Sequence, residues 1–217
     1  MSTQNNLKKR RIYLCTGVFA MLFSGVLYAW SSLKVPFRED FGFGEDVLSL
    51  NFTLTMCFFC LGAFFGSLIC KKIGVKLTLI IAGLLVGTGF VSTGLLTAQS
   101  SPWLLYITYA ILAGTGIGIS YNVVVATVCS WFPDRKGFCS GCLMMGFGAS
   151  ALILGNVADA MFKSSIGWRA TYIALGVSIL AALSLAGILI GKPALNAPKA
   201  NNAQSAQESD REELTSR

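Results

Sequence analysis

Few residues inside the long apolar stretches of this chain could carry chemistry, and nearly all of them are uncharged. Asp159 is the one ionisable exception, and it lies close to the end of its apolar stretch. The remaining polar and aromatic candidates within these stretches are Tyr28, Trp30, Ser31, Asn51, Thr53, Thr55, Tyr121 and Asn122. Buried tyrosine and asparagine side chains need hydrogen-bond partners, which a water-filled cavity can supply. The set indicates a path for a small polar molecule.

The same residues also have a structural interpretation. Tyr121 and Asn122 lie in a glycine-rich stretch, where cavity lining and hydrogen bonding between helices are both open. Trp30 and Trp103 fit an interfacial aromatic belt better than a binding site.

The cysteines offer a second kind of chemistry. Four of the seven cysteines form two pairs with CxxC spacing, Cys57 with Cys60 and Cys139 with Cys142, and the chain has no histidine. Free cysteine is a common buried apolar residue, so we interpret these thiols as structural. The sequence has no nucleophile–base pair, metal-ligand cluster or phosphate-binding loop. We therefore expect no catalytic residue, no metal and no cofactor, and conclude that the chain is not an enzyme.

The elements that would position the polar residues are transmembrane helices. Hydrophobic residues make up 54% of the chain and charged residues 12%, about half the charge of an ordinary soluble domain. Six apolar blocks are long enough for the roughly 20 residues that a helix needs to cross a bilayer. They are residues 12–33, 47–70, 76–98, 103–130, 137–162 and 168–191. None alternates as a barrel strand does, so we predict an all-α membrane protein of six helices.

The charges predict how these helices are oriented. On one side of the predicted membrane lie 13 cations, namely Lys8, Lys9, Arg10, Arg11, Lys71, Lys72, Lys76, Arg135, Lys136, Lys192, Lys199, Arg211 and Arg217. The other side holds Lys34, Arg38, Lys163 and Arg169. By the positive-inside rule the richer side is cytoplasmic. We expect a multi-pass protein of the cell membrane with both termini in the cytoplasm. The net charge of +7 then reflects topology and contact with anionic lipid, and we expect no nucleic-acid partner.

Three regions follow from this pattern. Residues 1–11 form a basic cytoplasmic lead, residues 12–191 the transmembrane domain, and residues 192–217 a polar tail or linker that is too poor in apolar residues to fold alone. The first helix is expected to be an uncleaved signal-anchor. Because the two groups of three helices enter from opposite sides, the topology predicts a three-plus-three inverted repeat.

Glycine is abundant, with 23 residues. Small-xxx-small pairs occur at Gly62/Gly66, Gly83/Gly87 and Gly137/Gly141. Such pairs allow helices to pack closely in lipid. Helices this rich in glycine also suit the sliding and bending that transporters require.

A set of motifs resembles the major facilitator superfamily. The most specific motif is WFPDRKG at residues 131–137. Three further motifs agree with it: the glycines Gly114, Gly116 and Gly118 followed by Tyr121-Asn122, residues 28–31 (YAWS) and residues 167–169 (GWR). Within the superfamily, the oxalate/formate antiporter and monocarboxylate-type branch is the closest likeness. The resemblance covers roughly residues 12–191.

This resemblance implies an alternating-access carrier of small organic anions such as oxalate, formate or lactate. In that branch, aromatic residues of helices one, four and five line the substrate site, and the matching positions here are Tyr28, Tyr121 and Phe147. Relatives often have tyrosine at the position of Phe147. Asn122 is added to the expected substrate site from its position beside Tyr121.

The loop between helices two and three departs from the family pattern. Where the superfamily signature has glycine and then aspartate, this chain has Ser67 and Lys71. In the family, that aspartate normally anchors the cytoplasmic gate. The lysine found here has the opposite charge. The residues we assign to the gating loops are Lys71, Lys72, Gly74, Lys76, Asp134 and Arg135.

The helix count is a second departure, because members of the family have twelve helices. The sequence resembles an N-terminal half, whereas the cations that pair with substrate in the oxalate branch lie in the second half. The chain could be a truncated product, one piece of a split transporter or a self-pairing half.

The expected partners are membrane lipid, a small carboxylate and either a second copy or a separate second half. A non-transporting partner of a full-length carrier is the alternative; a six-helix channel is the weakest reading, since no filter motif or ring of charge is visible.

Overall fold

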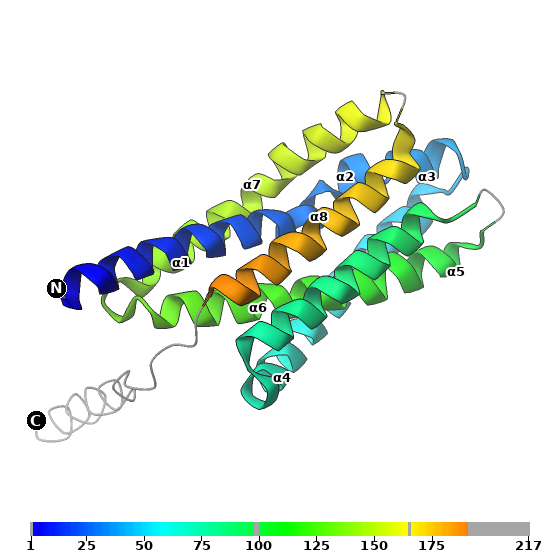
Figure 1. Ribbon diagram of the computed structural model, residues 1–217. Helices are drawn as coiled ribbons and strands as arrows, with labels where there is room; N and C mark the ends of the chain where they lie inside the picture. Colours follow the sequence, from blue (N-terminus) through cyan, green and yellow to red (C-terminus); the bar gives the residue numbers. More distant parts are fainter. Residues whose placement is uncertain (1, 98–99, 165, 191–217) are drawn as a thin grey trace, which may run out of the picture.

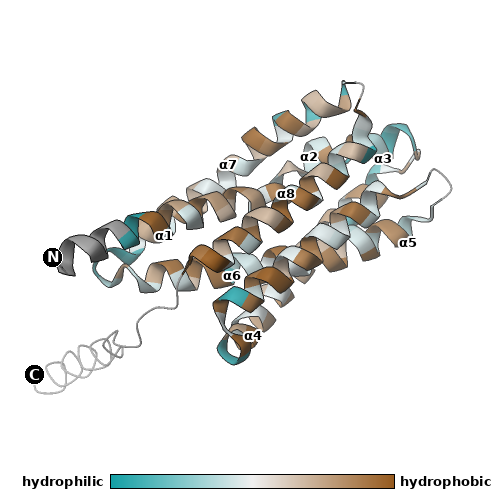
Figure 2. Ribbon diagram, in the orientation of Figure 1, coloured by the Kyte–Doolittle hydropathy of each residue, from teal (hydrophilic) through white to brown (hydrophobic). Residues whose placement is uncertain are grey.

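A computed structural model describes residues 2–97, 100–164 and 166–190, and within these ranges every regular element is helical (Figure 1). The predicted tail at 192–217 lies outside the described residues. Five segments are long and apolar enough to cross a membrane, namely Lys9–Glu39, Glu45–Gly94, Pro102–Ser130, Pro133–Phe162 and Gly167–Leu189. Hydrophobic residues dominate along most of their length, and hydrophilic residues gather near their ends (Figure 2). This is the pattern of a multi-pass membrane protein.

The first segment is longer than the sequence predicts. It consists of α1 (Ser2–Ser24), a 3₁₀ turn η1 (Gly25–Ala29), α2 (Trp30–Leu33) and α3 (Val35–Glu39). The loop expected to begin at Lys34 is instead helical through Glu39. Pro36 does not prevent this, because it occupies the first turn of α3, where a missing backbone N–H breaks no helical hydrogen bond.

The second segment, α4 (Glu45–Gly94), is folded back on itself. Gly74 has φ 83° and ψ 167°, non-helical values that divide the element into limbs 45–73 and 75–94. Glycine adopts positive φ without steric cost. Both limbs contact α6 at the same level: a Cβ on Gly114 would lie 2.9 Å from the Thr55 carbonyl oxygen, and one on Gly116 would lie 2.8 Å from that of Ala82. In a straight helix Thr55 and Ala82 would be about 40 Å apart. The ranges predicted as the second and third spans fall largely within these two limbs, which form one continuous element interrupted at Gly74.

The remaining segments complete the bundle. A short α5 (Pro102–Leu105), a π-helical turn η2 (Tyr106–Ala113) and α6 (Gly114–Ser130) follow one another without interruption. After η3 (Pro133–Arg135) come α7 (Lys136–Phe162) and α8 (Gly167–Leu189). In Figure 1, α7 runs beside the first segment, while α8 lies between α1 and α4.

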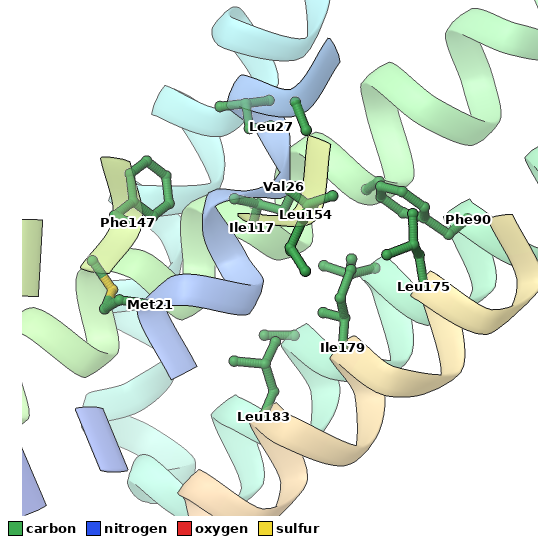
Figure 3. Packing of buried hydrophobic residues seen from close by; sticks show 14 of the residues in the cluster. Met21, Val26, Leu27, Phe90, Ile117, Phe147, Leu154, Leu175, Ile179 and Leu183 are labelled. Atoms are coloured by element: carbon green, nitrogen blue, oxygen red, sulfur yellow. The ribbon is translucent and has the colours of Figure 1, made fainter. Parts of the chain in front are cut away.

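The core joins all five segments. Its labelled residues in Figure 3 are Met21, Val26, Leu27, Phe90, Ile117, Phe147, Leu154, Leu175, Ile179 and Leu183. Close approach at glycine supports this packing, as predicted for two of the three pairs: Gly62 and Gly66 lie against α6, and Gly83 and Gly87 against α8. The expectation for Gly137 and Gly141 is wrong, since a Cβ at either position would have no described atom within 4 Å. Their spacing permits close packing, but no described helix faces them.

Candidate functional site

Three of the four residues predicted to bind substrate lie together. The ring centroid of Phe147 in α7 is 5.3 Å from that of Tyr28 in η1 and 5.0 Å from that of Tyr121 in α6. Phe59 of α4 joins them, 5.4 Å from Tyr121 and 6.2 Å from Phe147. Most of these pairs meet edge to face, the arrangement that aromatic quadrupoles favour. We call Tyr28, Phe59, Tyr121 and Phe147 the aromatic cluster; sequence reasoning did not include Phe59.

Glycines bring the helices of the aromatic cluster together. A Cβ on Gly25 would overlap the Phe147 carbonyl oxygen, and one on Gly118 would overlap that of Phe59. Only glycine permits such close backbone contact. Gly25 lies one helical turn before Tyr28, and Gly118 lies one turn before Tyr121. The close approaches therefore place these two rings beside Phe147 and Phe59.

A cavity of about 400 Å³ adjoins the aromatic cluster at Tyr28. It lies between the end of the first segment and the start of α4, and its lining residues are Tyr28, Trp30, Ser31, Lys34, Leu48, Ser49, Phe52 and Thr53. Ligand pockets commonly have volumes of about 300 to 1,000 Å³. Tyr28 is 47% exposed, which links the cavity to the rings of the cluster.

Lys34 is the one charged residue in this lining, and the sequence prediction assigned it to a loop. A signal was present, because Tyr28, Ser31 and Lys34 are spaced three residues apart and share one face if the helix continues. The helix does continue, since the Lys34 N–H donates to the Trp30 carbonyl oxygen at 2.9 Å.

Asn122 faces a different direction from Tyr121. Its Nδ2 donates to the Ala63 carbonyl oxygen at 3.0 Å, and its Oδ1 accepts from the Ser67 hydroxyl at 3.2 Å. Neighbouring residues of a helix point about 100° apart, so Asn122 meets α4 at Ala63 and Ser67, whereas Tyr121 meets it at Phe59. There it lines a separate cavity of about 220 Å³ with Ser67, Cys70, Lys71, Val123, Ala126 and Thr127. Both interpretations raised for Asn122 thus apply, but away from the aromatic cluster.

Trp30 is not a belt residue, and that prediction is wrong. Its side chain is 6% exposed, and its ring centroid lies 4.6 Å from that of Tyr109. Trp103, in contrast, is 72% exposed. Beneath Trp30, the Tyr109 hydroxyl is fully buried and has no hydrogen-bond partner among the described residues; the same holds for the side-chain amide of Asn51.

The residues predicted to gate gather at the end of the bundle where the chain begins. Asp134 pairs with Arg10, whose Nη2 lies 3.2 Å from the Asp134 carboxylate, and the Arg10 guanidinium also stacks over Phe132 at 4.9 Å. Lys71, Lys72, Lys76 and Arg135 are exposed. Within the described part of the chain, none of these four forms an ion pair. Asp134, the acidic residue among those predicted to gate, therefore contacts α1 and not the lysines near the turn at Gly74.

The opposite end is tied by several polar contacts. The Trp168 indole N–H donates to Asp40 at 2.6 Å, and the Tyr172 hydroxyl donates to the Leu33 carbonyl oxygen at 2.7 Å. Asp159, the one carboxylate expected within a span, accepts from the Ser32 hydroxyl at 3.1 Å. These contacts join the first segment to α7 and α8.

No cysteine is among the residues that line the cavity beside Lys34. All seven cysteines are free; Cys57 and Cys60 are exposed on α4, and Cys139 is buried. Among the described residues, no three histidine, cysteine, aspartate or glutamate side chains are grouped so that they could hold a metal ion.

Comparison with known sequences finds a match to the Major Facilitator Superfamily over residues 12–216. The oxalate:formate antiporter of Oxalobacter formigenes is 28% identical over 80% of this chain and 41% of its own length. Monocarboxylate transporter 12 of Mus musculus is 27% identical over 81% of this chain and 36% of its own length. Apicoplast pyruvate carrier 1 of Toxoplasma gondii is 30% identical over 48% of this chain and 18% of its own length. The chain thus spans less than half the length of these relatives, which are named for transport and not for catalysis.

Proposed function

This chain belongs to the Major Facilitator Superfamily, and on that premise we propose that it contributes one half of a carrier for a small organic carboxylate. The observation that carries the proposal is the meeting of Tyr28, Tyr121 and Phe147 beside a cavity of about 400 Å³. The edges of aromatic rings carry the positive part of the ring quadrupole, so ring edges together with a few polar groups suit a small anion. The names of the relatives mention oxalate, formate, pyruvate and monocarboxylates, and we propose substrates of this class, lactate included.

The proposed topology has six membrane passes as a three-plus-three inverted repeat, with α4 contributing two passes through its reversal at Gly74. The exposed cations Lys71, Lys72, Lys76 and Arg135 lie at the end where α1 begins. A cytoplasmic position for that end in the cell membrane follows the positive-inside rule.

Alternating access is the proposed mechanism. At Gly62, Gly66 and Gly118 the backbones of α4 and α6 lie in close contact with no glycine side chain between them. No bulky side chain at these positions has to repack when the helices slide. A second six-helix half, from another copy or another chain, would complete the central path and supply further cations to the substrate.

Uptake and assembly test this proposal together. The chain is reconstituted in vesicles alone and with the second half of a full-length relative, and uptake of labelled oxalate, formate and lactate is measured against protein-free vesicles. Carboxylate-dependent uptake, or binding at equilibrium, supports the proposal, and Tyr121→Ala should reduce it.

The size of the complex in mild detergent is measured in parallel. A monomer that neither binds carboxylates nor supports uptake in either preparation would contradict the proposed function. Co-purification with a full-length carrier under those conditions would favour a regulatory partner.

A further inference from the structure

The cavity beside Tyr28 holds a single charged group. Of its eight lining residues, five carry polar side-chain atoms and one, Lys34, is ionic. Lys34 is 28% exposed, with its ammonium group at the end of a helix face that also presents Ser31 and Tyr28. An ammonium group beside hydroxyls and an aromatic ring is a setting in which a carboxylate can bind.

An internal carboxylate already occupies this lysine. Lys34 Nζ lies 2.8 Å from Glu45 Oε2, and Arg38 Nη1 lies 3.2 Å from the other oxygen, Glu45 Oε1. Glu45 is the first residue of α4 and is half exposed. One carboxylate therefore bridges two cations across the junction between the first segment and α4.

This bridge can be exchanged without leaving a buried charge unpaired. Ion pairs at exposed positions are weak and respond to competition. When Lys34 turns away, Glu45 keeps its contact with Arg38, and it also remains in the first turn of α4, where the helix dipole favours an acidic residue. Lysine suits such an exchange, because its flexible stem carries a point charge with rotatable donors.

We propose that Lys34 is the cation of this half that recognises the substrate carboxylate, and that Glu45 holds Lys34 until the substrate displaces it. The inference rests on the transport function proposed above. A carboxylate at Lys34 would lie about 10 Å along the helix axis from Tyr28, so the cavity leads from the ion pair to the aromatic cluster. Glu45 then acts as a competing internal ligand at the entrance.

Equilibrium binding to the full-length chain in lipid nanodiscs tests the exchange, with oxalate, lactate and the uncharged lactamide as probes. Lys34→Gln should weaken oxalate and lactate by about tenfold or more, because a charge-assisted hydrogen bond is lost. Glu45→Gln should strengthen both by about three- to tenfold, because the internal competitor is removed. Lactamide should respond to neither change. Lys163→Gln, at an exposed lysine of the same end of the bundle, is the control and should bind as the parent chain does.

The outcomes separate this inference from the proposed function. Weaker carboxylate binding in Glu45→Gln would show that the Lys34–Glu45 pair is only structural. Unchanged binding in both variants would overturn the role of Lys34. If the parent chain binds carboxylates, both results leave the proposed function standing. A parent chain that binds no carboxylate overturns the inference, while the proposed function is then decided by uptake with a second half. If Lys34→Gln unfolds, Lys34→Met carries the test, and it should likewise weaken oxalate and lactate by about tenfold or more, because the positive charge is lost.

Discussion

The ring of Tyr28 meets the ring of Phe147 edge to face, with centroids 5.3 Å apart and planes at 80°. Tyr28 lies in the first segment and Phe147 in α7, far apart in the sequence. Phe147 is 5% exposed, whereas Tyr28 is 47% exposed. Phe147 thus supports the cluster from within the core, and Tyr28 presents its ring to the cavity.

Phe147→Ala should destabilise the bundle strongly. The substitution removes a buried ring that contacts Tyr28, Phe59 and Tyr121, a change that costs about 3 to 5 kcal/mol in a packed core. Phe138→Ala in the same helix is the matched control; its ring is 64% exposed, so a change within about 0.5 kcal/mol is expected. Thermal unfolding in mild detergent, followed by circular dichroism, measures both. Equal losses would contradict the supporting role of Phe147.

A pair of identical substitutions should separate a bonded hydroxyl from an unbonded one. Tyr172 and Tyr109 are both fully buried, but only the Tyr172 hydroxyl has a partner, the Leu33 carbonyl oxygen at 2.7 Å. Tyr172→Phe should therefore lower the free energy of unfolding by about 1 to 2 kcal/mol. Tyr109→Phe should leave it unchanged or raise it, because a buried polar group without a partner is removed. The same unfolding measurement decides, and a larger loss for Tyr109→Phe would indicate an unseen polar partner beneath Trp30.

Glycine content alone does not show which glycines matter. A Cβ at Gly118 would overlap the Phe59 carbonyl oxygen and lie 2.9 Å from the Ala63 nitrogen, whereas one at Gly148 would meet no described atom within 4 Å. Gly118→Ala should therefore cost about 1 to 3 kcal/mol through overpacking. Gly148→Ala should gain up to about 1 kcal/mol through helix propensity. Unfolding of the two variants side by side checks this, and a neutral Gly118→Ala would mean that α4 and α6 separate readily.

Much of this architecture follows from the sequence, because apolar blocks predict helices in lipid whatever their partners. The aromatic cluster was anticipated by resemblance, through Tyr28, Tyr121 and Phe147. The position of Lys34 on a helix beside the cavity was not predicted, because Lys-Val-Pro-Phe-Arg-Glu has the composition of a loop. Proline in the first turn nevertheless permits a helix.

Other features depend on tertiary contacts that spacing does not encode. An aromatic residue near the end of a span, such as Trp30, resembles a belt residue until Tyr109 is found against it. Asn122 was grouped with its neighbour Tyr121, but helix geometry sends the two side chains to different faces. Likewise, the spacing of Gly137 and Gly141 permits a close contact that no described helix makes.

The contact between Arg10 and Asp134 is the clearest link between α1 and the loop before α7. Arg10 is 24% exposed and Asp134 72% exposed, with a shortest distance of 3.2 Å. A double-mutant cycle with Arg10→Ala and Asp134→Ala should give a coupling free energy of about 0.2 to 1 kcal/mol. The coupling should shrink at high salt, because screening weakens exposed pairs.

Arg10→Ala alone should cost more than Asp134→Ala, since Arg10 also lies over the Phe132 ring at 4.9 Å, a cation–π contact worth about 0.5 to 1 kcal/mol at exposed sites. Arg135→Ala is the control, because this exposed arginine forms no ion pair within the described part of the chain. Free energies of unfolding at low and high salt provide the measurement. A coupling free energy of zero between Arg10 and Asp134 at low salt would mean that Asp134 does not anchor α1. The stability lost in Arg10→Ala would then come from the contact between Arg10 and Phe132 alone.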